Sequence, residues 1–283
     1  MWKTVQLCAT RPVPALAGMA LTLGATTAGP AGSEEIACEA KDHTQTIAQC
    51  TRVIESARTS KREVYKALLA RSEALHETGR LRDAVVDYSR LIQMYPDTNP
   101  GMTALLTLRG HLLHELDRYD EAIADFDRVL AEIPADHEVR IARAFAHHAD
   151  DQLNDALADW TYLIENAPDG DEYRSGRVGV YLDLGLTAEA FRDAKALLQS
   201  KPDDPLAHMS MGTVYAVIGD AEAAYRHLLE FPSGENPDRV ITWQKDLAMH
   251  GHYDGPKDGV ISPSFEDALR ACLAASPCRR FGF

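Results

Sequence analysis

A small residue recurs at a fixed interval through the middle of the chain, and this repeat constrains the fold more than any other feature. The positions are alanines that each follow a turn: Ala84, Ala122, Ala156, Ala190 and Ala224. From Ala122 onward the spacing is constant, and the first interval is slightly longer because of an additional loop at 98–101. A regular period of this length predicts a solenoid, in which each repeat packs on its neighbours.

Two further positions indicate that each repeat is a pair of helices. An aromatic or small residue stands four places after the alanine, at Tyr88, Phe126, Trp160 and Ala194, and a proline stands twelve places after it, at Pro96, Pro134, Pro168 and Pro202. Because proline cannot continue a helix, the second helix of each repeat should end just before it.

Residues 61–232 therefore resemble the tetratricopeptide repeat (TPR) family, and the segment Arg-Tyr-Asp-Glu-Ala-Ile at 118–123 matches it closely. The resemblance implies an all-α fold. We expect a right-handed superhelical solenoid of about five helix-turn-helix repeats, followed by a small helical C-terminal module. Residues 46–54 look like the second helix of a further repeat, so residues 33–60 are predicted to form an N-terminal capping half-repeat.

Residues 1–32 have the pattern of an export signal. They contain Lys3 and Arg11 but no acid, and the stretch from Val13 to Ala31 is apolar with many small residues. Such a segment predicts secretion, with cleavage after Ala28 or Ala31. A retained membrane anchor is the alternative. We expect a periplasmic or secreted protein.

The charge of the chain argues against nucleic acid as a partner. The net charge is −14, and loss of the signal, with its two basic residues and no acid, would make it −16. An acidic surface repels phosphate backbones, and no basic stripe interrupts it.

Four of the five cysteines form two close pairs in the sequence, Cys38 with Cys50 and Cys272 with Cys278. An even number of cysteines in an exported chain predicts disulfides, and local bridging is the most economical pairing. A zinc site is the alternative, although neither pair has CxxC spacing.

Four arginines each precede an aspartate at one constant spacing. They are Arg71, Arg109, Arg143 and Arg177, followed by Asp87, Asp125, Asp159 and Asp193. In an antiparallel helix pair these positions face each other, so we predict structural ion pairs within each repeat. A ladder of ligand-binding residues is the alternative. The fifth repeat has Met211 and His227 instead, and this joint loss supports a coupled pair.

The resemblance also implies that the first helix of each repeat lines a groove for a protein or peptide. The positions expected there are Lys66, Leu69, Glu73, His76, Glu77, Thr107, His111, His114, Glu115, Glu138, Ile141, Phe145, His148, Glu172, Ser175, Leu182 and Asp183.

Histidines recur in this set, so a metal site or a pH-sensitive groove is one interpretation and solvated surface histidines are the other. His76, His114 and His148 share one repeat position, but neighbouring helices lie about 10 Å apart, so only His111 and His114 are expected to be close. We predict no metal. His147 is expected in the core. No nucleophile-and-base, phosphate-loop or dinucleotide motif is present, so we expect neither an enzyme nor a cofactor.

The C-terminal residues 238–283 do not continue the repeat. A helix is followed by a loop with Gly251, Tyr253, Gly255, Asp258 and Gly259, and then by a second helix from residue 264. This segment resembles the peptidoglycan-binding-like domain, but Ser262 and Phe265 depart from its pattern. We expect Gly255 and Gly259 to adopt positive φ, Asp258 to cap a turn and Tyr253 to pack on both helices. Glycan binding and a purely structural end-piece both remain open.

These observations predict an exported, non-catalytic TPR scaffold that binds a protein or peptide in the bacterial cell envelope. The alternative is a cell-wall-binding accessory protein in which the repeats act as a spacer or an oligomerisation unit.

Overall fold

The computed structural model describes residues 42–94, 101–230 and 237–275, and every element in these ranges is helical. The predicted export signal, Cys38 and Cys278 lie outside the described residues. The described residues fall into two compact units, the first ending at Asp150 and the second beginning at Asp151.

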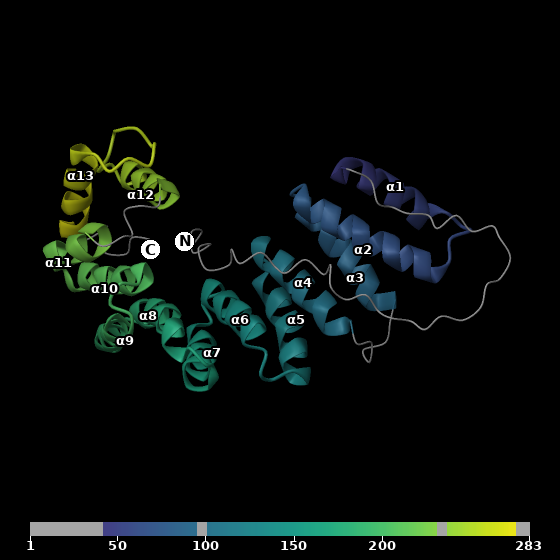
Figure 1. The fold of residues 1–283 in the computed structure, drawn as a ribbon, viewed down its shortest axis with the longest axis horizontal. Coiled ribbons are helices and arrows are strands. Elements are labelled where there is room, and N and C mark those ends of the chain that lie inside the picture. The colour runs from purple at the N-terminus through teal and green to yellow at the C-terminus, as the bar shows by residue number, and fades with distance from the viewer. Residues whose placement is uncertain (1–41, 95–100, 231–236, 276–283) are drawn as a thin grey trace. The chain divides into compact units, whose positions relative to one another are not determined.

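The first unit consists of six α-helices (Figure 1). They are α1 (His43–Glu55), α2 (Lys61–Glu77), α3 (Leu81–Met94), α4 (Met102–Glu115), α5 (Tyr119–Glu132) and α6 (His137–Ala149). Helices next to each other in the sequence pack together, from α1 on α2 through to α5 on α6. This nearest-neighbour order is the one that the repeat predicts.

The second unit continues the helical pairs and then adds the tail. Its elements are α7 (Leu153–Asn166), the 3₁₀-helix η1 (Gly170–Tyr173), α8 (Arg174–Asp183), α9 (Thr187–Ser200), α10 (Pro205–Ile218), α11 (Ala221–Tyr225), the π-helix η2 (Arg226–Glu230), α12 (Pro237–Met249) and α13 (Pro263–Ala274).

The helix ends confirm the prediction made from the prolines. Helix α5 ends two residues before Pro134, α7 two residues before Pro168 and α9 two residues before Pro202. A left-handed residue marks the other turn, between the two helices of each repeat, and it recurs at Gly79, Asp117, Asp151, Gly185 and Gly219. This regularity is not evident from the sequence, because aspartate replaces glycine in two of the five repeats.

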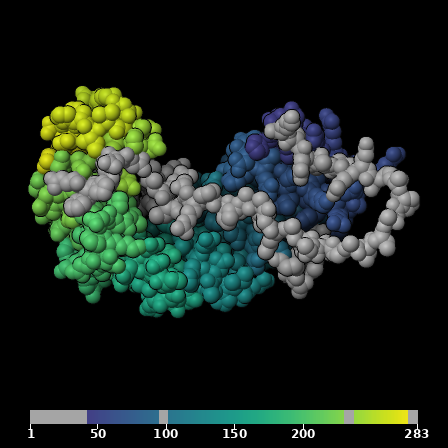
Figure 2. Space-filling view, viewed as in Figure 1, coloured from purple at the N-terminus to yellow at the C-terminus, as the bar shows by residue number. Residues whose placement is uncertain are grey.

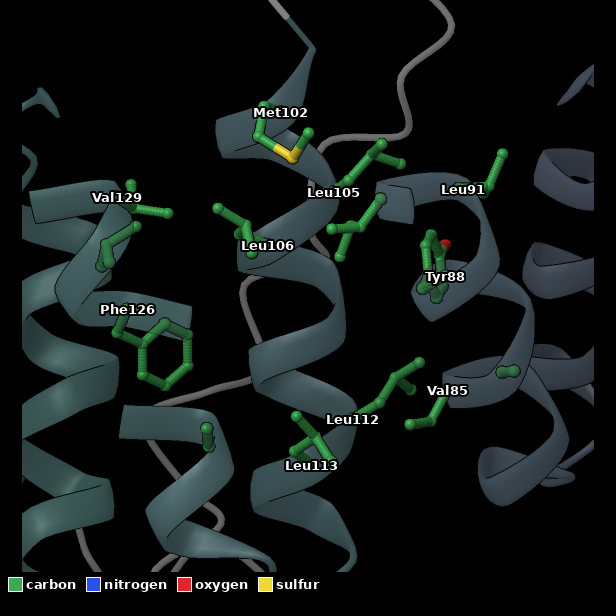
Figure 3. Packing of buried hydrophobic residues seen from close by; sticks show 14 of the residues in the cluster. Val85, Tyr88, Leu91, Met102, Leu105, Leu106, Leu112, Leu113, Phe126 and Val129 are labelled. Carbon is green, nitrogen blue, oxygen red and sulfur yellow. The ribbon is translucent and has the colours of Figure 1, made fainter. Parts of the chain in front are cut away.

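The core of the first unit explains why the repeat keeps its small residues. Side chains from α3, α4 and α5 converge in it, among them Leu91, Leu106 and Phe126 (Figure 3). Gly110 on α4 lies against the ring of Phe126, where an added Cβ would come within 2.5 Å of a ring carbon. In the fifth repeat, Gly212 faces Leu228 in the same way. A large residue on the second helix is thus matched by a small residue on the first.

The tail is a cap on the last repeat. Trp243 and Leu247 of α12 and Phe265 and Leu269 of α13 share one buried cluster with Tyr225 at the end of α11. Figure 2 shows the yellow tail lying directly on the green surface of this repeat. Among the described helices, none is both long enough and apolar enough to cross a membrane.

Candidate functional site

The predicted arginine and aspartate pairs are structural clamps between the two helices of a repeat. Arg71 donates to both carboxylate oxygens of Asp87 at 2.7 Å, and Arg109 donates to those of Asp125 at 2.8 and 2.6 Å. Arg177 makes the same two bonds to the carboxylate of Asp193, at 2.7 and 2.9 Å. These contacts confirm three of the four predicted pairs and leave the aspartates nearly buried.

The fourth pair stays a prediction, because Arg143 lies in the first unit and Asp159 in the second. Within the first unit, Arg143 donates to Asp127 at 2.6 Å.

Each clamp arginine also reaches back to the preceding repeat. Arg71 donates to the Thr51 hydroxyl at 2.9 Å, Arg109 to the Ser89 hydroxyl at 3.0 Å, and Arg177 to the Thr161 hydroxyl at 3.1 Å. The acceptors occupy the same position on the second helix of the preceding repeat. For Arg143 of the third repeat, the residue at this position is Asp127 on α5. The arginines therefore join neighbouring repeats as well as the helices of one repeat. Their guanidinium donors are already used in these hydrogen bonds within the protein.

The fifth repeat replaces the clamp by a pair of histidines. Met211 is buried, and His227 lies 3.0 Å from His208, measured between their Nδ1 atoms. The Nε2 atom of His208 is 2.8 Å from the carbonyl of Pro202, and the ring of His227 stacks on that of Tyr215. Burial lowers the pKa of His227, and the neighbouring His208 lowers it further. A pair of stacked histidines thus takes the place of an ion pair.

The groove positions of the first unit bring together residues from different repeats. Nε2 of His76 on α2 lies 3.9 Å from a carboxylate oxygen of Glu115 on α4. Burial lowers the pKa of His111, and the charges of His114 and His76 lower it further. His76 therefore contacts Glu115 and influences His111 electrostatically, while the expectation that only His111 and His114 lie close together stays a prediction. The cluster spans two repeats because the first helices of neighbouring repeats lie side by side.

His114 is half-buried and contacts both α5 and α6. Its ring packs edge-on against Tyr119, with the centroids 5.3 Å apart, and it bonds the backbone of Phe145 on α6. Burial lowers the pKa of His114, and the opposing effects of Asp117 and this bond are smaller. The Nε2 atom is buried and has no hydrogen-bond partner within the described part of the chain.

The remaining groove positions of the first unit differ in exposure. Glu73, one turn before His76, is exposed, yet the surrounding protein desolvates its carboxylate and raises its pKa. An exposed group with many neighbouring atoms is typical of a concave surface. Exposed positions are Lys66, Glu77 and Glu138, and half-buried ones are Leu69, Thr107, Ile141, Phe145 and His148.

In the second unit, two predicted groove residues take part in local structure. Glu172 lies in η1, pairs with Lys201, and accepts a hydrogen bond at its backbone carbonyl from the Ser175 hydroxyl. Leu182 and Asp183 are half-buried near the end of α8. His147, predicted to be a core residue, is indeed buried.

The loop of the tail is built around a glutamine that the sequence did not single out for this role. The buried side chain of Gln244 donates to Asp258 and to the carbonyl of Val260, and it accepts from the amide of Gly259 at 3.0 Å. Asp258 caps the turn by accepting from the amide of Val260, as predicted.

Tyr253 is buried edge-on to Phe265, 5.9 Å away between centroids. Gly259 has the expected positive φ of 78°, but Gly255 does not. The reason for glycine at 255 is space, because an added Cβ would lie 2.4 Å from the Tyr253 hydroxyl; Gly251 has the second positive φ, 76°.

Neither a metal-binding cluster nor both members of a predicted cysteine pair lie within the described residues. No group of three or more His, Cys, Asp or Glu side chains there is arranged to hold a metal ion. Cys272 is buried and disulfide-bonded, and its predicted partner Cys278 lies outside the described residues. Cys50 is buried on α1, and its pairing with Cys38 stays a prediction.

Comparisons with known proteins agree with the fold. The model of the Tetratricopeptide repeat family TPR_16 matches residues 69–137. The solved structure of a tetratricopeptide repeat protein from Parabacteroides merdae ATCC 43184 is 17% identical, with a TM-score of 0.60 over 85% of this chain and 87% of that chain. The fold is therefore a TPR solenoid.

Two further solved structures are less similar. MamA is 16% identical over 59% of this chain and 88% of its own, with a TM-score of 0.49. YrrB, described as a TPR protein with an unusual peptide-binding site, is 18% identical over 68% of this chain and 90% of its own, with a TM-score of 0.45. The comparison with curated proteins finds no match.

Proposed function

We propose that this protein is a non-catalytic scaffold that holds a protein or peptide in the groove formed by the first helices of its repeats. The observation that carries the proposal is the convergence of His76, His111, His114 and Glu115 from two repeats. The clamps do not use these side chains. The clamp arginines, by contrast, already bond to the protein itself.

The shape of the surface also favours an extended partner. Helices α2, α4 and α6 contribute the cluster and the half-buried ring of Phe145, so the residues form a row that crosses several repeats. A peptide lying along such a row meets polar groups at one point and an aromatic side chain at another, and this combination gives specificity as well as affinity.

The test is peptide selection on the full chain followed by affinity measurements. A phage-displayed library of random dodecapeptides is selected at pH 7.5, and the best peptides are titrated by fluorescence anisotropy. The double variant H111N/E115Q should bind them about tenfold more weakly than wild type, because two central contacts are lost.

The matched control is E132Q/H250N, which makes the same chemical changes at exposed positions on α5 and at the end of α12. It should bind within about twofold of wild type. Equal binding by both double variants, with unchanged circular dichroism, would place peptide binding outside the groove and reject the proposal.

We also propose, from the sequence of residues 1–32, that the protein is exported to the bacterial cell envelope. A fusion of these residues to alkaline phosphatase, which is active only after export from the cytoplasm, tests this directly. An inactive fusion contradicts export.

Attachment to the cell wall through the tail is the alternative function. Sedimentation of the full chain with purified peptidoglycan sacculi tests it, and retention that is lost in the variant D258N/K257A would favour it. The described loop side chains Gln244, Tyr253 and Asp258 already bond within the tail. This supports the scaffold over wall binding.

A further inference from the structure

The histidine cluster lies between carboxylates, and this arrangement fixes the sign of its charge at a given pH. We define the cluster as His76, His111 and His114, with Glu73 and Glu115 beside it. Neutral histidines leave only the two carboxylates charged, so the cluster is negative. Full protonation of the histidines adds three positive charges and reverses the sign.

We propose that this cluster binds a basic segment of the partner, an extended stretch containing lysine or arginine, at neutral pH and releases it when the histidines are protonated. The inference rests on the proposed function, since it names the partner chemistry and the regulation of the same groove.

Neutral histidines suit a basic partner in two ways. Glu115, 40% exposed at its side chain, supplies the opposite charge close to His76. Guanidinium groups also stack on aromatic rings, and Phe145 lies next to His114.

The surrounding charges do not cancel this effect. The carboxylates of α3 and α5 that meet the first helices, Asp87 and Asp125, are neutralised by Arg71 and Arg109 in the clamps. Asp117, in the turn after α4, favours protonation of His114 only as a secondary effect and bonds the Tyr119 hydroxyl at 2.7 Å.

Four further ionisable groups occupy predicted groove positions on these first helices. Lys66 is about two turns before Glu73 on α2, and Glu77 follows His76. On α6, Glu138 and His148 lie at further groove positions. The acids outnumber the lysine, so the row is negative when the histidines are neutral.

Protonation changes two interactions at once. A charged His76 pairs with Glu115, 3.9 Å away, and removes that carboxylate from the partner. Charged His111 and His114 then repel each other and any cation in the groove. Burial lowers the pKa of both below the ordinary value of 6.5, so this repulsion begins only at acidic pH. Desolvated Glu73 also loses its charge more readily on acidification, which acts in the same direction.

The experiment compares sequence preference and pH dependence. Random dodecapeptides are selected on the full chain at pH 7.5, as above, and one selected peptide is titrated at pH 7.5 and 5.5 at constant ionic strength. We expect enrichment of lysine and arginine and an affinity at least about tenfold lower at pH 5.5 for wild type. The ratio of the affinities at pH 7.5 and pH 5.5 should be smaller for H76N/H111N than for wild type, whatever its affinity at pH 7.5, whereas the control H250N should show the wild-type ratio.

The possible failures are distinguishable. Selected peptides that are neutral or acidic, or that bind equally at both pH values, overturn this inference, although H111N/E115Q still weakens them and the proposed function stands. If no peptide is selected, or if the groove variants bind as the control does, the proposed function itself fails and the inference with it.

Discussion

Substituting one residue of a clamp pair should lower the free energy of unfolding far more than substituting both residues. Asp125 accepts two hydrogen bonds from Arg109, and its side chain is only 3% exposed, whereas that of Arg109 is 20% exposed. The substitution R109M leaves this carboxylate buried without its counter-ion and also removes the bond to Ser89. Breaking a buried pair in this way costs about 3–5 kcal/mol.

The double variant R109M/D125L removes the stranded charge and should lie within about 1 kcal/mol of wild type. The assay is urea unfolding of the full chain followed by circular dichroism. With a slope of about 2 kcal/mol per M, the midpoint for R109M falls by roughly 2 M.

A surface pair provides the control for this experiment. Arg80 and Asp83 form an ion pair with both side chains more than half exposed, and R80M should cost less than about 1 kcal/mol. The reasoning is refuted if R109M costs no more than R80M, or if the double variant costs as much as the two single substitutions added together. Either result would mean that the buried carboxylate is not the source of the penalty.

Three further predictions concern packing, pH and the tail. G110A should destabilise by about 1–3 kcal/mol, because its methyl group overlaps the buried ring of Phe126, and the smaller F126L should recover part of the loss in the same urea assay. Stability should fall between pH 7 and 5.5, because burial lowers the pKa of His111 in the folded state, so the unfolded chain takes up protons first; H111N should reduce this fall in urea midpoint. Q244L should speed hydrogen exchange at the amide of Gly259, which it leaves without its acceptor, and an unchanged rate would contradict the role given to Gln244.

The sequence predicts those parts of the structure that depend on spacing within one repeat. The clamp between Arg109 and Asp125 follows from the constant spacing of arginine and aspartate, and the end of α5 follows from Pro134. Both involve two helices joined by a short turn, so their geometry is nearly independent of the rest of the chain.

Contacts between repeats are less predictable because they depend on the length of the connecting loop. Arg109 reaches Ser89 across 20 residues, whereas Arg177 reaches Thr161 across 16. For Arg143 of the third repeat, the acceptor is the carboxylate of Asp127 and not a hydroxyl. For the same reason the contact between His76 and Glu115 depends on how two repeats stack, which the sequence pattern does not specify.

The glycines of the tail show a different limit. Gly255 and Gly259 look alike in sequence, and both are expected at positive φ. Only Gly259 needs it, while Gly255 is required because the Tyr253 hydroxyl occupies the space of a side chain. A glycine in a sequence indicates that a side chain is not tolerated at that position. The structure is needed to show whether the reason is a positive φ or a neighbouring atom in the space of the Cβ.

The first helix of each repeat divides its residues between stability and binding. The positions two and five residues after the clamp arginine lie about 200° and 140° from it around the helix, so they point away from the clamp. These positions are Glu73 and His76 on α2, His111 and His114 on α4, and Phe145 and His148 on α6.

The clamp position keeps arginine because its partner, an aspartate, lies in the same repeat. The groove positions vary because their proposed partner is another molecule. In the fifth repeat the clamp is lost, and the second groove position is Ala216, buried in the cluster that contains the tail. In the fifth repeat the tail therefore covers this groove position, and a partner is expected to engage other repeats.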